Sequence, residues 1–410
     1  MQVVYARCAG LDVHKKTVVV TVLLTASNGA VTKETRTFST MTAELLRLEA
    51  WLADLQVDHL AMESTGVYWY PLYTLLEEGR TVLLVNPQHI KAVPGRKTDV
   101  RDSEWLADLL RHGLLSPSFI PPKPIRELRE VTRYRKQLVY ERTQYANRLQ
   151  KVLESSNIKL AAVASDILGV SGRAMLEALI AGEQEAARMA EYARGRMRQR
   201  LPDLRQALEG RVSPHHRFLL RQILKHIDGV DQELLEVEQQ IAAYLQPYEE
   251  ASQLLQTIPG IGAPAAAALI SELGVDMTRF PSAKHLASWA GVCPGNNQSG
   301  GKRMSAGTTG GNRWVRAILG EVVWVISRTK GTYLAAQFQR LMRRRGKYKA
   351  VMAVAHTLLV IIYHMLRDHV PYADLGPDYF DRLDQARVER HHVRRLEQLG
   401  YTVTLSPAVA

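Results

Sequence analysis

The stretch that decides the fold is residues 9–24, AGLDVHKKTVVVTVLL, in which the acidic residue Asp12 stands between two apolar segments. The second segment, Thr17 to Leu24, has the β-branched composition of a strand, and the residues from Val4 to Leu11 are expected to form another. A third strand is expected from Val31 to Phe38. The sequence therefore predicts that the chain begins with three antiparallel strands.

Helices and strands are expected to alternate from there to about residue 115. The predicted elements are a helix over about 43–55, a strand over 59–63, a helix over 68–78, a strand over 81–85 and a helix over 99–110. Three antiparallel strands followed by helix, strand, helix, strand and helix is the order of an RNase H-like fold. The Pro-rich stretch 116–124 ends this first domain, residues 1–115.

Four carboxylates stand at the ends of these strands or at the start of a helix: Asp12, Glu63, Asp99 and Asp102. The last two are three residues apart, which places them on one helix face. Hard oxygen ligands suit Mg²⁺, with Mn²⁺ as the alternative, and two such ions about 4 Å apart stabilise both oxygens of an in-line phosphoryl displacement. Each residue alone has a plainer explanation as a turn former or helix cap. Taken together, they predict a metal-dependent catalytic site.

Composition favours a polyanionic partner. The chain has 410 residues with 53 Lys and Arg against 41 Asp and Glu, a formal net charge of +12. Its two cysteines are too few for a disulfide framework, which fits a reducing cytoplasm. No signal pattern and no uninterrupted apolar run of membrane length is present, so no membrane partner is expected, and the apolar stretch 351–365 is expected to be a buried helix.

The middle region, about residues 125–250, is predicted to be helical. Apolar residues of Ile125 to Asn157 and of His216 to Leu245 follow a nearly heptad spacing, which suits either a coiled-coil partner or a helical hairpin within the chain. A row of basic residues accompanies the first helix, and it is either a nucleic-acid-binding face or a solvated one: Arg126, Arg129, Arg133 and Lys136.

The third region, residues 251–368, combines two patterns that suit phosphate binding. Ile258-Pro259-Gly260-Ile261-Gly262 before an Ala-rich helix resembles a helix-hairpin-helix, in which Gly260 and Gly262 let backbone N–H groups approach a phosphate; a plain helix connection is the alternative. A Gly-rich segment follows from residue 294 to 313. The basic candidates for phosphate contacts are Lys302, Arg303, Arg313 and Arg316, with Lys15, Lys16 and Lys97 beside the carboxylates. The basic tail, residues 369–410, is expected to be an added nucleic-acid arm or a dispensable helix.

These motifs together resemble those of the transposases of the insertion sequence 110 family, which are related to the Piv-type DNA invertases. The residues that carry the resemblance lie in five segments: Gly10 to Lys16, Met62 to Trp69, Lys97 to Asp102, Ile258 to Gly262, and Ser299 to Lys302. The resemblance implies a RuvC-like DEDD domain, a coiled-coil segment and a helical transposase domain bearing a nucleophilic serine.

By matching positions, the resemblance implies that Asp12, Glu63, Asp99 and Asp102 bind Mg²⁺ and that Ser299 attacks DNA to form a covalent phosphoserine link. Ser305 is the nearby competitor for the nucleophile. The resemblance implies that the protein acts with a structured bridge RNA that pairs with donor and target DNA, and that it assembles as a tetramer like the family's members. From the heptad-like spacing and the resemblance together, we expect a dimer to a tetramer. The expected function is therefore RNA-guided DNA recombination. The alternatives are a junction-resolving nuclease that uses water and leaves Ser299 idle, and a non-catalytic nucleic-acid-binding protein.

Overall fold

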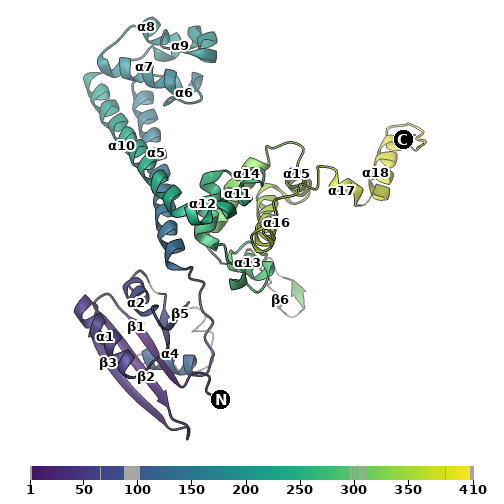
Figure 1. Cartoon of the computed structure of the whole chain (residues 1–410). Coiled ribbons are helices and arrows are strands. Elements are labelled where there is room, and N and C mark those ends of the chain that lie inside the picture. Colours follow the sequence, from purple (N-terminus) through teal and green to yellow (C-terminus); the bar gives the residue numbers. More distant parts are fainter. Residues whose placement is uncertain are drawn as a thin grey trace. The chain divides into compact units, whose positions relative to one another are not determined.

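The computed structural model describes residues 2–64, 66–86, 102–295, 298–299, 301–303, 307–308, 310–383 and 385–406. For residues 298, 299, 302, 303, 387 and 388 it describes the backbone alone. The chain divides into two compact units, Met1–Ile120 and Pro121–Ala410, and their elements are labelled in Figure 1.

A five-stranded sheet forms the centre of the first unit. Its strands are β1 (Arg7–Val13), β2 (Thr17–Thr25), β3 (Val31–Ser39), β4 (His59–Glu63) and β5 (Thr81–Val85), in the order β3-β2-β1-β4-β5. The first three are antiparallel, whereas β4 and β5 run parallel to β1. The predicted strands are confirmed, except that the first begins three residues late and extends to Val13, so that Asp12 lies inside β1.

Alternation along β1 gives the sheet two different faces. Leu11 packs into a core with Leu48 of α1 (Thr42–Asp54) and Leu72 of α2 (Trp69–Leu76), on one side of the sheet. Cys8 packs on the other side, against Ala107 of α4 (Asp102–Arg111). Three antiparallel strands extended by two parallel ones, with helices on both faces, are consistent with the expected RNase H-like fold.

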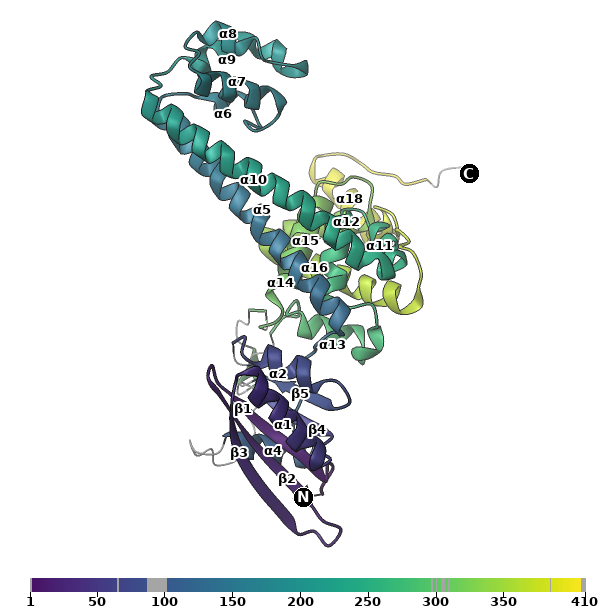
Figure 2. The same cartoon turned by 60° about the vertical axis from the view of Figure 1, so that its left-hand side comes forward.

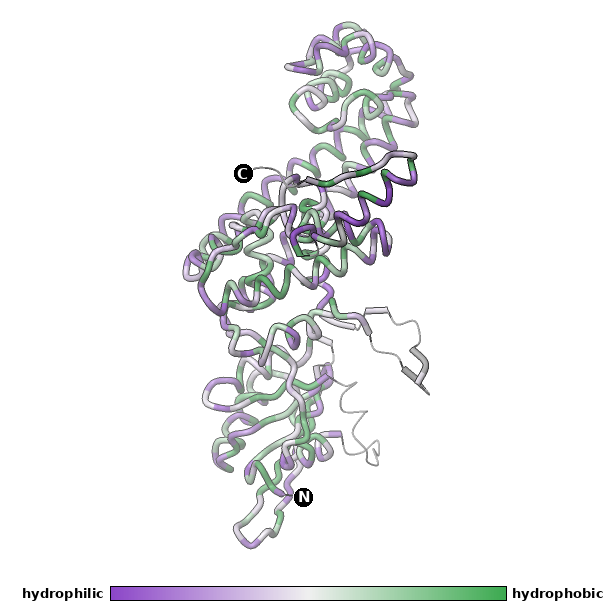
Figure 3. Tube along the Cα trace, turned by 90° about the vertical axis from the view of Figure 1, so that its right-hand side faces the viewer, coloured by the Kyte–Doolittle hydropathy of each residue, from purple (hydrophilic) through white to green (hydrophobic). Residues whose placement is uncertain are grey.

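Two long helices dominate the second unit. α5 (Lys123–Ser155) and α10 (Pro214–Leu245) lie side by side in Figures 1 and 2. Arg135 binds Glu238, and Arg142 binds Asp231, so that later residues of α5 meet earlier residues of α10 and the two helices are antiparallel. Hydrophobic and hydrophilic residues alternate along both (Figure 3). Of the two arrangements that the heptad spacing allowed, the structure shows the helical hairpin within one chain.

Short helices form a tip at the far end of this hairpin. They are α6 (Leu160–Val163), α7 (Val170–Ala181), α8 (Ala186–Ala190), the 3-10 helix η1 (Gly195–Arg200) and α9 (Leu201–Leu208). Met175 and Leu204 pack with Leu149 of α5 and Leu220 of α10 in a common core. The backbone N–H of Arg211 donates to the carbonyl of Ser156 at 2.8 Å, so both ends of the tip meet at one place.

The rest of the second unit is a helical bundle with one small hairpin. Its elements are η2 (Gln246–Tyr248), α11 (Glu249–Gln256), α12 (Ala263–Leu273), η3 (Met277–Arg279), α13 (Ala283–Trp289), β6 (Gln298–Ser299), β7 (Lys302–Arg303), α14 (Arg313–Ile326), α15 (Tyr333–Arg345), α16 (Lys347–Asp368), α17 (Tyr379–Arg382) and α18 (Gln385–Gln398).

α16 is the central helix of this bundle. By length and composition alone it is apolar enough to cross a membrane, and among the described residues it is the one helix of that kind. It instead packs against α11, α13, α14 and α15, with Val354, Leu358 and Ile362 fully buried. This is the buried helix that the sequence predicts.

Candidate active site

Asp12 and Glu63 occupy neighbouring positions at one end of the sheet. The parallel register of β1 and β4 pairs Gly10 with Ala61 and Leu11 with Met62, so the next residues along the two strands are Asp12 and Glu63. Side chains alternate along a strand, which places both carboxylates on the face that α4 covers. Both residues are partly exposed.

The start of α4 brings Asp102 to the same end. The Cys8 thiol donates to the carbonyl of Ala107 at 3.6 Å, whereas Ser103 bonds to Thr21, the partner of Gly10 in the sheet, at 2.8 Å. α4 therefore runs antiparallel to β1, and its first residue lies toward the end of β1 that carries Asp12. This arrangement places three of the four predicted acids toward the carboxyl ends of β1 and β4.

Gly10 makes the close approach of α4 possible. A Cβ atom at this position would lie 2.1 Å from the carbonyl oxygen of Ser103 and 2.5 Å from the backbone nitrogen of Ala107. Real Cβ atoms do not approach backbone atoms so closely. Gly10, two residues before Asp12, is therefore required by the packing of α4 that positions Asp102.

The turn after β1 adds basic groups beside Asp12. The Nε2 atom of His14 lies 3.1 Å from Oδ2 of Asp12, and Lys15 and Lys16 are exposed in the same turn. His14 was not among the predicted site residues. The signal for it was its position two residues after Asp12, which puts both side chains on one face of an extended segment.

The remaining acid, Asp99, and the nearby Lys97 lie outside the described residues, in the segment 87–101. Within the described part of the chain, no group of three or more His, Cys, Asp or Glu residues lies close enough together to hold a metal ion. The chemistry of Asp12, Glu63 and Asp102 nevertheless fits Mg²⁺, because all three offer hard carboxylate oxygens. A metal centre here is a proposal that depends on the fourth acid.

Ser299 lies in a short hairpin of the second unit rather than in an open loop. Ser299 of β6 pairs with Lys302 of β7, and Gln298 pairs with Arg303. Below them, the N–H of Gly295 donates to the carbonyl of Gly307 at 2.7 Å. Ser299 therefore occupies the last paired position before the turn of the hairpin. The competitor, Ser305, lies outside the described residues.

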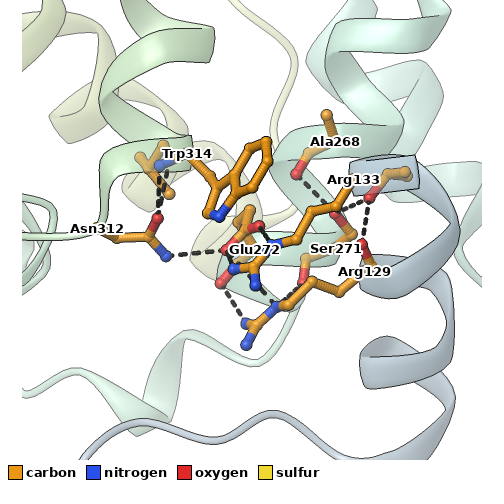
Figure 4. Close-up of polar contacts among 9 residues, drawn as sticks. Arg129, Arg133, Ala268, Ser271, Glu272, Asn312 and Trp314 are labelled. Atoms are coloured by element: carbon orange, nitrogen blue, oxygen red, sulfur yellow. Dashed lines mark hydrogen bonds and ion pairs between the residues drawn. The ribbon is translucent and has the colours of Figure 1, made fainter. Parts of the chain in front are cut away.

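A buried carboxylate holds the base of this hairpin. Glu272, at the end of α12, is 1% exposed, and it accepts hydrogen bonds from Nε and Nη2 of Arg133 at 2.7 and 2.9 Å. Its Oε2 also accepts from Nδ2 of Asn312 at 2.8 Å. Asn312 in turn caps α14 by accepting from the N–H groups of Trp314 and Val315. Figure 4 shows Glu272 between the guanidinium of α5 and the amide at the hairpin base.

The basic row of α5 is largely used by this internal network. Arg129 donates to the carbonyls of Ser271 and Glu272, both at 2.9 Å, and the buried Arg126 donates to the carbonyl of Pro121. Arg133 binds Glu272 as described. These three arginines join α5 to its surroundings, so their N–H groups are engaged within the protein and are less able to contact nucleic acid. Lys136 binds Glu321 but keeps a partly exposed side chain.

The two glycines of the Pro-Gly turn between α11 and α12 have different surroundings. Gly260 has a φ of +94°, and a Cβ there would lie 3.0 Å from the side chain of Ile326, so its need for glycine comes from packing on α14. Gly262 is exposed and stays a candidate for a phosphate contact. The turn joins the two helices α11 and α12, whereas the helix-hairpin-helix and its contact with a phosphate stay predictions.

The basic residues around the hairpin also differ. Arg313 is exposed and lies over the ring of Trp314, at 5.2 Å from its centroid, and Arg316 is half-buried and bonds to Thr308 at 3.2 Å. Lys302 and Arg303 lie on β7, with only their backbone described. Among the two residues of this group with described side chains, Arg313 is the one exposed enough to reach a phosphate.

Two family models match the chain. The model of the DEDD transposase of IS110 elements, described as "Transposase", matches residues 9–158. A second, described as "Transposase IS116/IS110/IS902 family", matches residues 252–339. The first match contains the predicted acids, and the second contains Ser299 and Glu272.

Three relatives illustrate the similarity. A probable family 20 transposase of Pseudomonas aeruginosa is 26% identical over 322 residues, covering 76% of this chain and 85% of that protein. The pilin gene-inverting protein of Moraxella bovis is 38% identical over 127 residues, covering 30% of this chain and 38% of that protein. An uncharacterized protein of insertion element IS110 from Streptomyces coelicolor is 28% identical over 305 residues, covering 69% of this chain and 74% of that protein. With both models matching at the segments that carry the candidate site, the chain belongs to the IS110 family of transposases.

Proposed function

We propose that this transposase cuts and rejoins DNA through a covalent link to Ser299, with Asp12, Glu63, Asp99 and Asp102 binding Mg²⁺ and a bridge RNA selecting the DNA. The observation that supports the proposal is the position of Asp12 and Glu63 at the same end of the neighbouring parallel strands β1 and β4, with the start of α4, which carries Asp102, lying toward that end. Carboxylates gathered in this way suit divalent cations as ligands. Bound Mg²⁺ would neutralise the developing charge on a phosphate and lower the pKa of a coordinated hydroxyl.

The serine reaction is a phosphoryl transfer. The Ser299 Oγ attacks a DNA phosphorus and forms the O–P bond, the bond from phosphorus to one deoxyribose oxygen breaks, and that oxygen takes up a proton as the serine loses one. Because a phosphodiester is replaced by another phosphodiester, the bond energy is kept and the reverse attack by a DNA hydroxyl rejoins the strand. Ser299 needs activation, since a serine hydroxyl is a weak nucleophile at neutral pH.

Residues near each part of the site bind phosphates in this proposal. Lys15 and Lys16 are exposed beside Asp12, and Arg313 is exposed at the base of the serine hairpin. Each phosphate contact of this kind adds to affinity and to its salt dependence. For the assembly, we propose a dimer to a tetramer, in which the acids of one subunit serve the serine of another.

The test is the formation of a protein–DNA adduct. Labelled DNA is incubated with the protein, Mg²⁺ and RNA transcribed from the non-coding flank of the element, and the products are separated on a denaturing gel. We expect a slow band that protease removes, that is absent with Ser299→Ala and Asp12→Asn, and that Ser305→Ala retains.

The alternative of a metal-dependent nuclease predicts a different result. Free DNA ends without an adduct, formed equally by the protein and by Ser299→Ala, would assign the chemistry to water and remove Ser299 from the site. An adduct that is lost in Ser305→Ala instead would move the nucleophile to that residue.

A further inference from the structure

The turn between α15 and α16 concentrates positive charge. Six of the ten residues from 340 to 349 are basic, and none is acidic: Arg340, Arg343, Arg344, Arg345, Lys347 and Lys349. We call residues 340–349 the basic elbow. It carries six positive charges, half of the formal net charge of +12 of the whole chain.

The elbow is held in a fixed conformation by the helices on both sides. Gly346 has a φ of +82° and is the single residue between the end of α15 and the start of α16. Its N–H donates to the carbonyl of Met342 at 3.0 Å, and its own carbonyl accepts from Ala350 at 3.1 Å. Phe338 anchors α15 in the bundle. The charges are therefore presented on ordered backbone, and binding would not have to fix this turn first.

The basic side chains of the elbow lack carboxylate neighbours. All residues from Arg343 to Lys349 are exposed, and within the described parts of the chain no elbow residue forms an ion pair. Two of them instead lie over aromatic rings, Lys347 on Trp324 at 4.4 Å and Arg340 on Phe380 at 5.3 Å. By contrast, Arg133, Arg135 and Arg142 of α5 each bind an acid. The positive charges of the elbow repel one another, and binding of an anion from outside the chain would reduce this repulsion.

An exposed aromatic residue belongs to the same ten-residue segment as these charges. Tyr348 is 82% exposed, more than any other large hydrophobic side chain of the described residues. It lies between Lys347 and Lys349, at the start of α16. An exposed ring flanked by cations is the arrangement with which proteins bind unpaired nucleotides, because the ring stacks on a base while the cations bind phosphates. A fully paired duplex offers no free base face for such a ring.

We propose that the basic elbow is a binding site for an unpaired nucleic-acid strand, with Arg343, Arg344 and Arg345 on its phosphates and Tyr348 stacked on a base. This proposal rests on the proposed function in one respect, namely that the protein acts on nucleic acid. Two sources share this chemistry: an unpaired segment of an RNA and a DNA strand displaced from its duplex.

The test compares four variants of the full-length protein by fluorescence anisotropy. The probes are a single-stranded DNA and a single-stranded RNA of about 20 nucleotides and a DNA duplex of the same sequence. The elbow variant is R343Q/R344Q/R345Q. Its matched control, R188Q/R205Q/R279Q, removes the same charge from exposed arginines that are paired with Glu185, Glu191 and Asp276. Tyr348→Ala is compared with Tyr348→Phe, which keeps the ring, and thermal unfolding checks that each variant is folded.

We expect the elbow variant to bind single strands at least about tenfold more weakly than the control, with the slope of log affinity against log salt smaller by about 2. Tyr348→Ala should weaken single-strand binding about fivefold to a hundredfold, and Tyr348→Phe should not. A loss on RNA alone assigns the site to RNA, and a loss on single-stranded DNA alone assigns it to a displaced strand.

Two outcomes would overturn the proposal. One is an elbow variant that binds single strands as tightly as its control. The other is an equal loss on duplex and single strands with no effect of Tyr348→Ala, which would show a general charge effect. If the elbow variants behave in either way while the serine adduct still forms, the elbow proposal fails alone. If the unaltered protein binds none of the probes, the proposed function fails with it.

Discussion

Replacing Glu272 tests whether the buried network in Figure 4 holds the second unit together. The carboxylate is 1% exposed and receives three hydrogen bonds from Arg133 and Asn312. Removing one partner of a buried ion pair costs about 3–5 kcal/mol, because the remaining charge is left without its counter-charge. Two arginines lose this counter-charge: Arg133, whose side chain is 32% exposed, and Arg129, whose Nε lies 3.6 Å from Oε2 of Glu272 and whose side chain is 13% exposed. Water relieves part of the cost at Arg133, and the hydrogen bonds of Arg129 to two backbone carbonyls relieve part of it there. We therefore expect Glu272→Gln to lower the free energy of unfolding by about 2–3 kcal/mol, since Arg133 keeps some solvation.

The assay is thermal unfolding, with Glu238→Gln as the matched control. Glu238 also accepts two hydrogen bonds from one arginine, Arg135, but its side chain is 46% exposed, so its loss should cost less than about 1 kcal/mol. A loss of 2–3 kcal/mol corresponds to a fall in Tm of about 3–5 °C for a unit of this size. Equal Tm values for Glu272→Gln and Glu238→Gln would refute the reasoning.

A second measurement locates the effect. Asn312 loses its bond to Glu272 in the variant, and the cap that it gives to the N–H groups of Trp314 and Val315 should weaken. Hydrogen exchange at the start of α14 should therefore accelerate more than exchange in α10. Uniform acceleration in both helices would show general destabilisation instead of a loosened hairpin base.

Three further outcomes are expected. Gly10→Ala should destabilise the first unit by about 1–3 kcal/mol and reduce DNA cleavage, because the added Cβ would meet the backbone of α4. The control is Gly229→Ala, where a Cβ would have open space around it. Equal unfolding curves for Gly10→Ala and Gly229→Ala would contradict the packing of α4 on Gly10. Burial raises the pKa of Cys8 to about 12, so a maleimide at neutral pH should modify the partly exposed Cys293 much faster than Cys8 in the folded protein, and modification of both at one rate would show that α4 does not cover Cys8. Burial lowers the pKa of His356 from its ordinary value of 6.5; the unfolded chain then binds a proton more readily, so stability should fall as pH drops from 6.5 toward the folded-state pKa, and His356→Gln should flatten that part of a Tm–pH profile.

Local sequence patterns were enough to predict the first unit. Its strands are runs of apolar and β-branched residues, and four of the five begin where they were expected. The common end at which Asp12 and Glu63 lie follows from the order of the strands, since both residues stand at or next to the last position of neighbouring parallel strands. Helix starts were less accurate because capping depends on a few residues, and α5 begins at Lys123 instead of Ile125.

Long-range pairing explains what the sequence did not reveal. The basic row of α5 looked available for nucleic acid because its partner, Glu272, is 139 residues away from Arg133 in the chain. A lone glutamate at the end of an Ala-rich helix gives no sign that it will be buried. The hairpin that carries Ser299 has no signal in the sequence, because strands of two residues carry no periodicity. The basic elbow could have been found, since six cations in ten residues are visible in the sequence.

The closed base of the hairpin tip has an evolutionary consequence. The chain leaves α5 and returns to α10 at one point, where Arg211 bonds to Ser156. The tip is thus a side branch of the chain, and a change in the length of its loops need not alter the path of α5 or α10. Most of it lies in residues 159–251, between the two stretches that the family models match. The residues of the branch that pack on Leu149 of α5 and Leu220 of α10 are constrained by that shared core, whereas those that face away from it can vary without disturbing the hairpin.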